Sequence, residues 1–220
     1  NYELLLGLKP DIVLLYGIGD AQTAITDKLK ELSIPYIYMG EYLEESPLGK
    51  AEWMVVLSEL TDSREKGIEI FSEIPKRYLS LKALTESVGQ CPTVMFNMPW
   101  NDSWVMPSTK SYMAQLVADA GAEYIYKENS SNSSTPIGLE TAYGLIQKAD
   151  YWINVGSATS LDELKTVNPK FADAKAVRER TVYNNNLRLT PTGGNDYWES
   201  AVVHPDMVLR DLIHIFHPEL

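Results

Sequence analysis

The chain has 220 residues, of which 45% are hydrophobic and 22% are charged, and its formal net charge is −11. These proportions are typical of a globular protein with one large or two small domains. The negative charge and the lack of a basic stripe argue against nucleic acid as a partner, because a phosphate backbone would be repelled. Cys91 is the single cysteine, so no intrachain disulfide can form.

The region near the N-terminus reads as a β-α-β unit. An apolar run at residues 12–16 reaches a glycine turn, a helical pattern follows, and a second apolar run covers residues 35–39. A short helix over residues 2–8 precedes it. Two strands are fewer than an open sheet normally has, so a segment upstream of Asn1 is expected to supply more of them.

Two helices are predicted next, the second of them long. The first is amphipathic and covers residues 53–60, and the second keeps a helical spacing of apolar residues over 63–88. At 1.5 Å per residue the second helix would measure about 39 Å, more than a compact unit of this size needs. It is therefore expected to connect two lobes, with a kink at Pro75.

A second α/β unit begins after this helix. The candidate strands are residues 93–97, 124–126, 151–155 and 182–184, and the candidate helices are residues 112–120, 139–149, 161–167 and 205–216. A segment rich in Ser and Asn, residues 127–136, is expected to be a mobile loop.

The predicted fold class is α/β, with two α/β lobes joined by a single long helix and a first lobe that is truncated at its N-terminus. The expected division is a partial N-terminal lobe at residues 1–62, the connecting helix at 63–88 and a C-terminal lobe at 89–220.

The glycine turn at residues 17–19 leaves a nucleotide site open as an alternative. Gly-Ile-Gly follows a strand and precedes a helix, and Glu41 follows the next strand, where a ribose-binding acid belongs. However, Gln22 occupies the third glycine position, and Asp20 would place negative charge where a pyrophosphate should bind. A nucleotide-dependent α/β enzyme using this turn is the alternative to a binding protein.

No other motif favours catalysis or a resident metal ion. His204, His214 and His217 lack a recognisable third ligand in sequence and are read as exposed terminal histidines. The chain contains no Gly-x-Ser-x-Gly elbow and no P-loop. The sequence therefore predicts no catalytic residue, no metal site and no cofactor.

Aromatic and cationic residues gather where a ligand crevice is expected. In open α/β sheets that crevice lies beyond the carboxyl ends of the strands. An arginine there could bind a carboxylate with its planar fork, although each aromatic side chain could instead anchor its loop to the core. The candidate ligand-binding residues are Tyr16, Trp100, Trp104, Tyr112, Arg188, Tyr197 and Trp198.

Several stretches resemble the periplasmic binding proteins of iron-siderophore, haem and cobalamin uptake. They are LKPDIVL at residues 8–14, LKELSIPY at 29–36, PLGKAEW at 47–53, and YWES followed by HPDMVLRDL within 197–212. The resemblance covers nearly all of the chain. It implies a protein without catalytic activity that passes a metal chelate to an ABC permease.

The resemblance also implies a location and a set of contacts. The protein would be periplasmic or at the cell surface, lipid-anchored through a segment upstream of Asn1. Independently of the resemblance, the cleft of such a binding protein is expected to be formed by the loops at residues 16–20, 97–104, 154–156 and 184–188. One glutamate on each lobe would dock into permease arginines, Glu199 on the second and Glu45 on the first, with Glu44 or Asp20 as alternatives.

Overall fold

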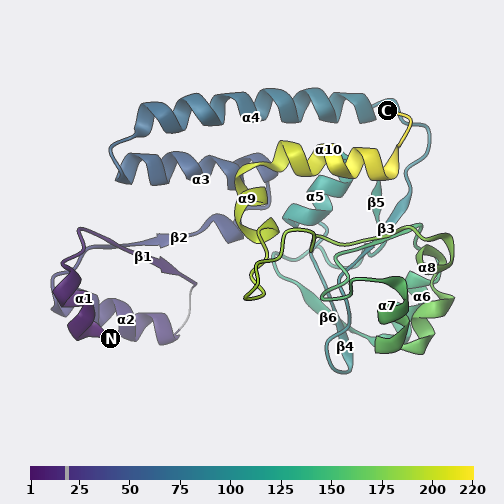
Figure 1. The fold of residues 1–220 in the computed structure, drawn as a ribbon, viewed down its shortest axis with the longest axis horizontal. Helices are drawn as coiled ribbons and strands as arrows, with labels where there is room; N and C mark the ends of the chain where they lie inside the picture. The colour runs from purple at the N-terminus through teal and green to yellow at the C-terminus, as the bar shows by residue number, and fades with distance from the viewer. Residues whose placement is uncertain (18–19) are drawn as a thin grey trace. The chain divides into compact units, whose positions relative to one another are not determined.

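The computed structural model describes residues 1–17 and 20–220, which form two compact units, residues 1–44 and 45–220. The first unit contains a two-stranded parallel sheet, in which Val13 lies opposite Tyr36 and Tyr16 opposite Met39. Its elements are α1 (Tyr2–Leu8), β1 (Val13–Tyr16), α2 (Asp20–Glu31), β2 (Tyr36–Met39) and the 3-10 helix η1 (Glu41–Leu43). The β-α-β unit expected from the sequence is present (Figure 1).

The core of the first unit is small. Its buried hydrophobic residues are Leu15, Leu29 and Ile34, with a few half-buried neighbours packed around them. Leu4 and Leu8 of α1 are exposed. A two-stranded sheet is normally too small to be stable in isolation, so this unit has little packing energy of its own.

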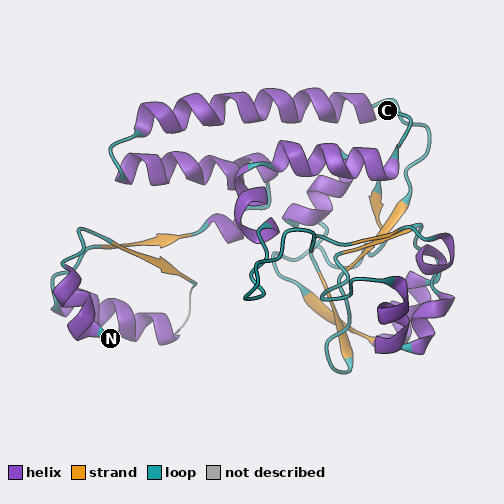
Figure 2. Cartoon of the chain, in the orientation of Figure 1, coloured by secondary structure: helices purple, strands orange, loops and turns teal. Residues whose placement is uncertain are grey.

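The second unit is built on a four-stranded parallel sheet of order β5-β3-β7-β8. Its strands are β3 (Thr93–Phe96), β5 (Glu123–Tyr124), β7 (Tyr151–Ile153) and β8 (Val182–Tyr183). The helices of this unit are α3 (Pro47–Leu60), α4 (Arg64–Thr85), α5 (Tyr112–Asp119), α6 (Leu139–Ile146), α7 (Leu161–Val167), α8 (Lys175–Glu179), α9 (Tyr197–Val203) and α10 (Pro205–Phe216), with a 3-10 turn η2 (Pro169–Asp173). Figure 2 shows helices on both sides of the sheet, as a parallel sheet requires.

Aromatic side chains fill the core of the second unit. Trp104 and Trp152 are fully buried, with ring centroids 5.7 Å apart, and both pack against Phe171. Phe96 stacks on Tyr124 at 4.3 Å. This core contains many more buried residues than the core of the first unit.

Helices α3 and α4 pack closely because of a glycine. A Cβ atom on Gly67 would lie 2.0 Å from Oγ of Ser58, so no larger residue fits there without moving the two helices apart. A helix lies where the long helix was predicted, but it covers residues 64–85 instead of 63–88 and includes Pro75.

A buried polar cluster ties α4 to α5. The Tyr78 hydroxyl donates to Oδ2 of Asp119 at 2.5 Å, and Nζ of Lys82 lies 2.8 Å from Oδ1 of the same carboxylate. Arg77 of α4 pairs with Asp206 of α10 at 2.5 Å. Through these contacts and its packing on α3, α4 belongs to the second unit. Its role as a connector between lobes remains a prediction.

The structure corrects some details of the sequence analysis. Strands β4 (Ser103–Met106) and β6 (Thr135–Gly138) form an antiparallel pair, so the segment expected to be a loop ends in a strand. His217 is buried rather than exposed, and its Nε2 lies 3.0 Å from the carbonyl oxygen of Gly121. Across the described ranges, no helix combines the length and apolarity needed to cross a bilayer.

Candidate functional site

An asparagine directly follows three neighbouring strands of the second unit. Asn97 comes after β3, Asn154 after β7 and Asn184 after β8. The backbone φ angles of Asn97 and Asn154 are 65° and 61°, in the left-handed region that asparagine tolerates better than most residues. Since parallel strands end at one edge of their sheet, these amides are brought together where ligands of open α/β sheets bind.

The side-chain amides form a continuous hydrogen-bonded chain along this edge. Nδ2 of Asn195 donates to Oδ1 of Asn185 at 3.3 Å, and Nδ2 of Asn185 donates to Oδ1 of Asn154 at 3.4 Å. Nδ2 of Asn154 then donates to Oδ1 of Asn97 at 2.6 Å, and Nδ2 of Asn97 donates to the carbonyl of Val105 at 3.4 Å. The chain of four amides links β3, β7 and the segment after β8 without placing any formal charge at the edge.

Two buried tryptophans hold the backbone beneath these amides. Nε1 of Trp152 donates to the carbonyl oxygen of Asn97 at 2.7 Å, and Nε1 of Trp104 donates to that of Phe96 at 2.8 Å. A buried indole N–H needs a partner, and here both partners lie at the end of β3. The core therefore supports the conformation of the strand end.

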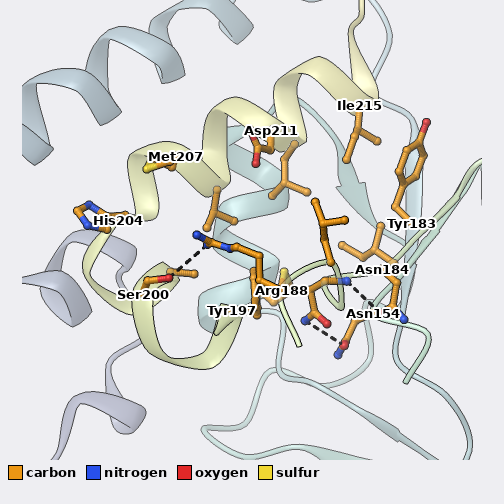
Figure 3. Close-up of a pocket in the computed structure, with 17 residues that line it drawn as sticks. Asn154, Tyr183, Asn184, Arg188, Tyr197, Ser200, His204, Met207, Asp211 and Ile215 are labelled. Atoms are coloured by element: carbon orange, nitrogen blue, oxygen red, sulfur yellow. Dashed lines mark hydrogen bonds between the residues drawn. The ribbon is translucent and has the colours of Figure 1, made fainter. Parts of the chain in front are cut away.

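A pocket of about 500 Å³ opens beside this edge (Figure 3). Its walls come from the ends of β7 and β8, from the segment 184–188, and from α9 and α10. Apolar side chains make up a large part of its lining, including Met207, Leu212 and Ile215 of α10. Its volume lies within the range of small-molecule sites, which are mostly apolar with a few placed polar groups.

Arg188 enters this pocket but already has a carboxylate partner. Its NH2 atom lies 2.9 Å from Oδ2 of Asp196 and 3.3 Å from Oγ of Ser200. The Ser200 hydroxyl donates to the same Asp196 oxygen at 2.6 Å. Figure 3 shows the guanidinium extended toward Ser200 on α9. The three side chains form one polar cluster at the rim.

Three of the predicted ligand-binding residues lie in or beside the pocket. Arg188 and Tyr197 line it, and the hydroxyl of Tyr112 donates to the carbonyl of Ala201, a lining residue, at 3.4 Å. Burial raises the pKa of Tyr197 to about 12, and burial also raises the pKa of Tyr112 well above its ordinary value. Both phenols are neutral near pH 7, so they can donate and accept hydrogen bonds but place no charge at the pocket.

The other four predicted residues lie elsewhere. Trp104 is fully buried in the core, so its side chain has no exposed surface for a ligand. Trp100 is 75% exposed in the turn between β3 and β4, and Trp198 is 56% exposed on α9. Tyr16 belongs to the first unit, where its ring lies 4.7 Å from that of Tyr42.

The carboxylates predicted to dock a permease are partly accessible. Glu199 is exposed in the first turn of α9, and Glu45 is exposed just before α3. Glu45 is the first residue of the second unit, so it shares that unit with Glu199, whereas Glu44 is the last residue of the first. The Asp20 side chain, together with Ile18 and Gly19 of the glycine turn, lies outside the described residues.

Sequence reasoning missed one wall of the pocket. Met207, Asp211 and Ile215 lie on one face of α10, and His204 lies just before it. The sequence predicted a helix over this segment, but not that one of its faces would line a cavity. Asn195 was also missed, although it precedes the aromatic pair that begins α9.

The family model described as periplasmic binding protein matches residues 1–186. Two uncharacterized lipoproteins of Methanocaldococcus jannaschii are 28% and 25% identical over the whole chain, which covers 51% and 56% of their lengths. The chain thus spans about half the length of these curated relatives.

Solved structures share the fold. A possible iron-binding (periplasmic solute-binding) protein of Staphylococcus epidermidis has a TM-score of 0.72 at 14% identity, over 99% of this chain and 80% of that one. The vitamin B12 binding protein BtuF of Vibrio cholerae has a TM-score of 0.69 at 15% identity, over 98% and 77% of the two chains. Because the family model covers most of its residues, this chain belongs to the periplasmic binding protein family.

Proposed function

We propose that this protein is the extracytoplasmic solute-binding component of an ABC importer for a metal chelate such as a siderophore, haem or cobalamin. The observation that carries the proposal is the pocket at the carboxyl edge of the second sheet, in a chain of the periplasmic binding protein family. Structural neighbours named for iron, haem and vitamin B12 binding support this class of solute. The protein binds and releases its solute without chemical change.

The solute contacts Arg188 and Tyr197 in the pocket, with Tyr112 supporting the wall. Trp100 and Trp198 are exposed aromatic side chains of the second unit that offer further flat surfaces to a bulky solute, and Tyr16 is an exposed aromatic side chain of the first unit. Trp104 is left out of the proposed site because it is buried.

The test is a titration of the full-length protein with haem, cobalamin and several ferric siderophores, followed by tryptophan fluorescence. Saturable quenching by one of them is expected, because Trp198 lies on a helix that lines the pocket and its indole is accessible. No response across the panel contradicts the proposal. Nucleotides belong in the same panel, and saturable binding of one would favour the enzyme alternative.

Glu199 and Glu45 dock the permease. Both are exposed carboxylates, and charged pairs at an interface set its register and encounter rate. Replacing either with glutamine is expected to weaken binding to the permease complex in nanodiscs by several-fold, while solute affinity is retained. Glu86→Gln, an exposed glutamate at the end of α4, is the matched control. Equal permease binding by Glu199→Gln and Glu86→Gln would contradict the assignment.

The protein is held at the outer face of the membrane by a lipid anchor upstream of Asn1. This part of the proposal rests on the two relatives named as lipoproteins. Membrane fractionation and fatty-acid labelling of the full-length protein test it. A protein that is unlabelled and released without detergent would contradict the anchor but not the binding function.

A further inference from the structure

The pocket carries no surplus of positive charge. Among its described lining residues, Arg188 is the one arginine or lysine and Asp211 the one carboxylate. Asp211 pairs with Arg210 at 3.3 Å, and Arg188 pairs with Asp196 at 2.9 Å. Each formal charge at the pocket therefore has an opposite charge within contact distance.

The charge of Arg188 is neutralised by Asp196 at the rim of the pocket. Asp196 is held by two groups, because its carboxylate forms an ion pair with Arg188 and accepts a hydrogen bond from the Ser200 hydroxyl. The backbone helps, since the Asp196 N–H donates to the carbonyl oxygen of Arg188 at 3.2 Å. An anion that approaches the guanidinium meets this carboxylate as well, so attraction and repulsion largely cancel.

Uncharged amides make up part of the remaining polar lining. Asn154 and Asn185 each use one amide N–H in the chain of amides, which leaves a second N–H for an uncharged carbonyl, amide or hydroxamate oxygen. Apolar side chains such as Met207 and Leu212 supply contact area for the uncharged faces of a ligand. The overall charge of −11 adds a long-range field that repels anions.

From this balance we infer that the pocket selects a bulky chelate without net negative charge, presenting apolar faces and neutral amide-like groups, over an anionic chelate of the same shape. The inference rests on the proposed function and narrows its solute class. Asp196 is the specificity-determining residue, because it compensates the one lining cation.

The test uses probes that differ in charge and little in shape. Haem is compared with haem dimethyl ester, and cyanocobalamin with its monocarboxylic acid derivative, each titrated into the full-length protein. The uncharged member of whichever pair binds is expected to bind about tenfold or more tightly than its anionic counterpart. Tighter binding of the anionic member overturns the inference and leaves the proposed function intact.

Asp196→Asn supplies the second arm. This variant leaves Arg188 uncompensated and is expected to raise affinity for the anionic member about tenfold, with little change for the neutral one. Glu73→Gln is the matched control, because it removes one negative charge and frees Lys76 on α4, which contributes no described residue to the pocket lining.

The outcomes separate the two proposals. An anionic-ligand affinity that Asp196→Asn leaves unchanged, or that Glu73→Gln raises equally, overturns the role of Asp196. Far-UV circular dichroism establishes that both variants are folded. If no member of either pair and no siderophore binds, the proposed function fails and the charge preference falls with it.

Discussion

The two ends of the four-stranded sheet in the second unit are held by different kinds of interaction. At the amino end, the carboxylate of Asp150 accepts hydrogen bonds from the backbone N–H and hydroxyl of Thr93, both at 2.7 Å, and pairs with Lys175 at 2.5 Å. At the carboxyl end, neutral amides of Asn97 and Asn154 bond to each other, and their backbones adopt left-handed conformations.

This difference separates a structural role from a functional one. At the amino end, the charge-assisted contacts of Asp150 with Thr93 and Lys175 hold the starts of the strands together. An uncharged amide chain joins the strand ends beside the pocket proposed to bind the solute. Changes at the carboxyl end should therefore affect both stability and solute binding, whereas changes at the amino end should affect stability alone.

The largest expected effect comes from removing the core support of the carboxyl end. Trp152→Ala deletes a fully buried ring and leaves the Asn97 carbonyl without its donor, which should cost about 3–5 kcal/mol of unfolding free energy. Urea denaturation measures this loss. Trp198→Ala, at an exposed position, should cost less than about 1 kcal/mol, and equal midpoints for the two variants would show that Trp152 does not support the edge.

A smaller effect is expected at the strand end itself. Asn154→Ala loses two amide hydrogen bonds and places alanine at a φ of 61°, at a cost of about 2–3 kcal/mol. Asn154→Gly loses the same hydrogen bonds, but glycine adopts a positive φ angle without strain. This variant should therefore be more stable than the alanine variant by about 1 kcal/mol. Both should weaken solute binding. If both variants bind the solute with wild-type affinity, the chain of amides is not part of the binding site.

The smallest effect is a pH dependence at the amino end. Burial favours the neutral acid, but hydrogen bonds from Lys175 and Thr93 outweigh it and lower the pKa of Asp150 below its ordinary value. The stability from this carboxylate is therefore present above the pKa of the unfolded chain, about 3.9, and is lost as pH falls through the lower folded value.

Asp150→Asn should accordingly lose less stability than wild type on acidification, with unchanged solute affinity at neutral pH. Thermal unfolding across the acid range measures the first quantity. Asp162→Asn, at an exposed ion pair on α7, is the control and should keep the wild-type pH profile. A change in solute affinity in Asp150→Asn would contradict the prediction that the amino end of the sheet affects stability alone.

Much of the fold could be predicted from periodicity. The apolar runs before residues 17, 97 and 184 predicted β1, β3 and β8, and helix α10 was predicted at its observed bounds, Pro205–Phe216. The antiparallel pair β4–β6 was not predicted, because Thr135 and Pro136 lie in a run of polar and turn-forming residues. That pairing depends on contacts with a distant segment and not on local preference.

The site was predictable only in part. The loops carrying Asn97, Asn154 and Arg188 were expected to line a cleft because they follow parallel strands. The sequence could not show that Trp104 turns into the core, since an aromatic residue near a strand end has the same pattern in either role. Nor could it show the pairing of Arg188 with Asp196, which depends on how the segment before α9 folds back.

The tight fit of Gly67 against Ser58 and the ties from Arg77, Tyr78 and Lys82 fasten α4 to its neighbours at several points along its length. A helix held in this way makes a stable reference frame for spectroscopy. Cys91, the single cysteine, is exposed shortly after α4 and accepts a thiol-reactive dye without any prior mutation. A dye at this position would report changes in its surroundings from a point close to this fixed helix.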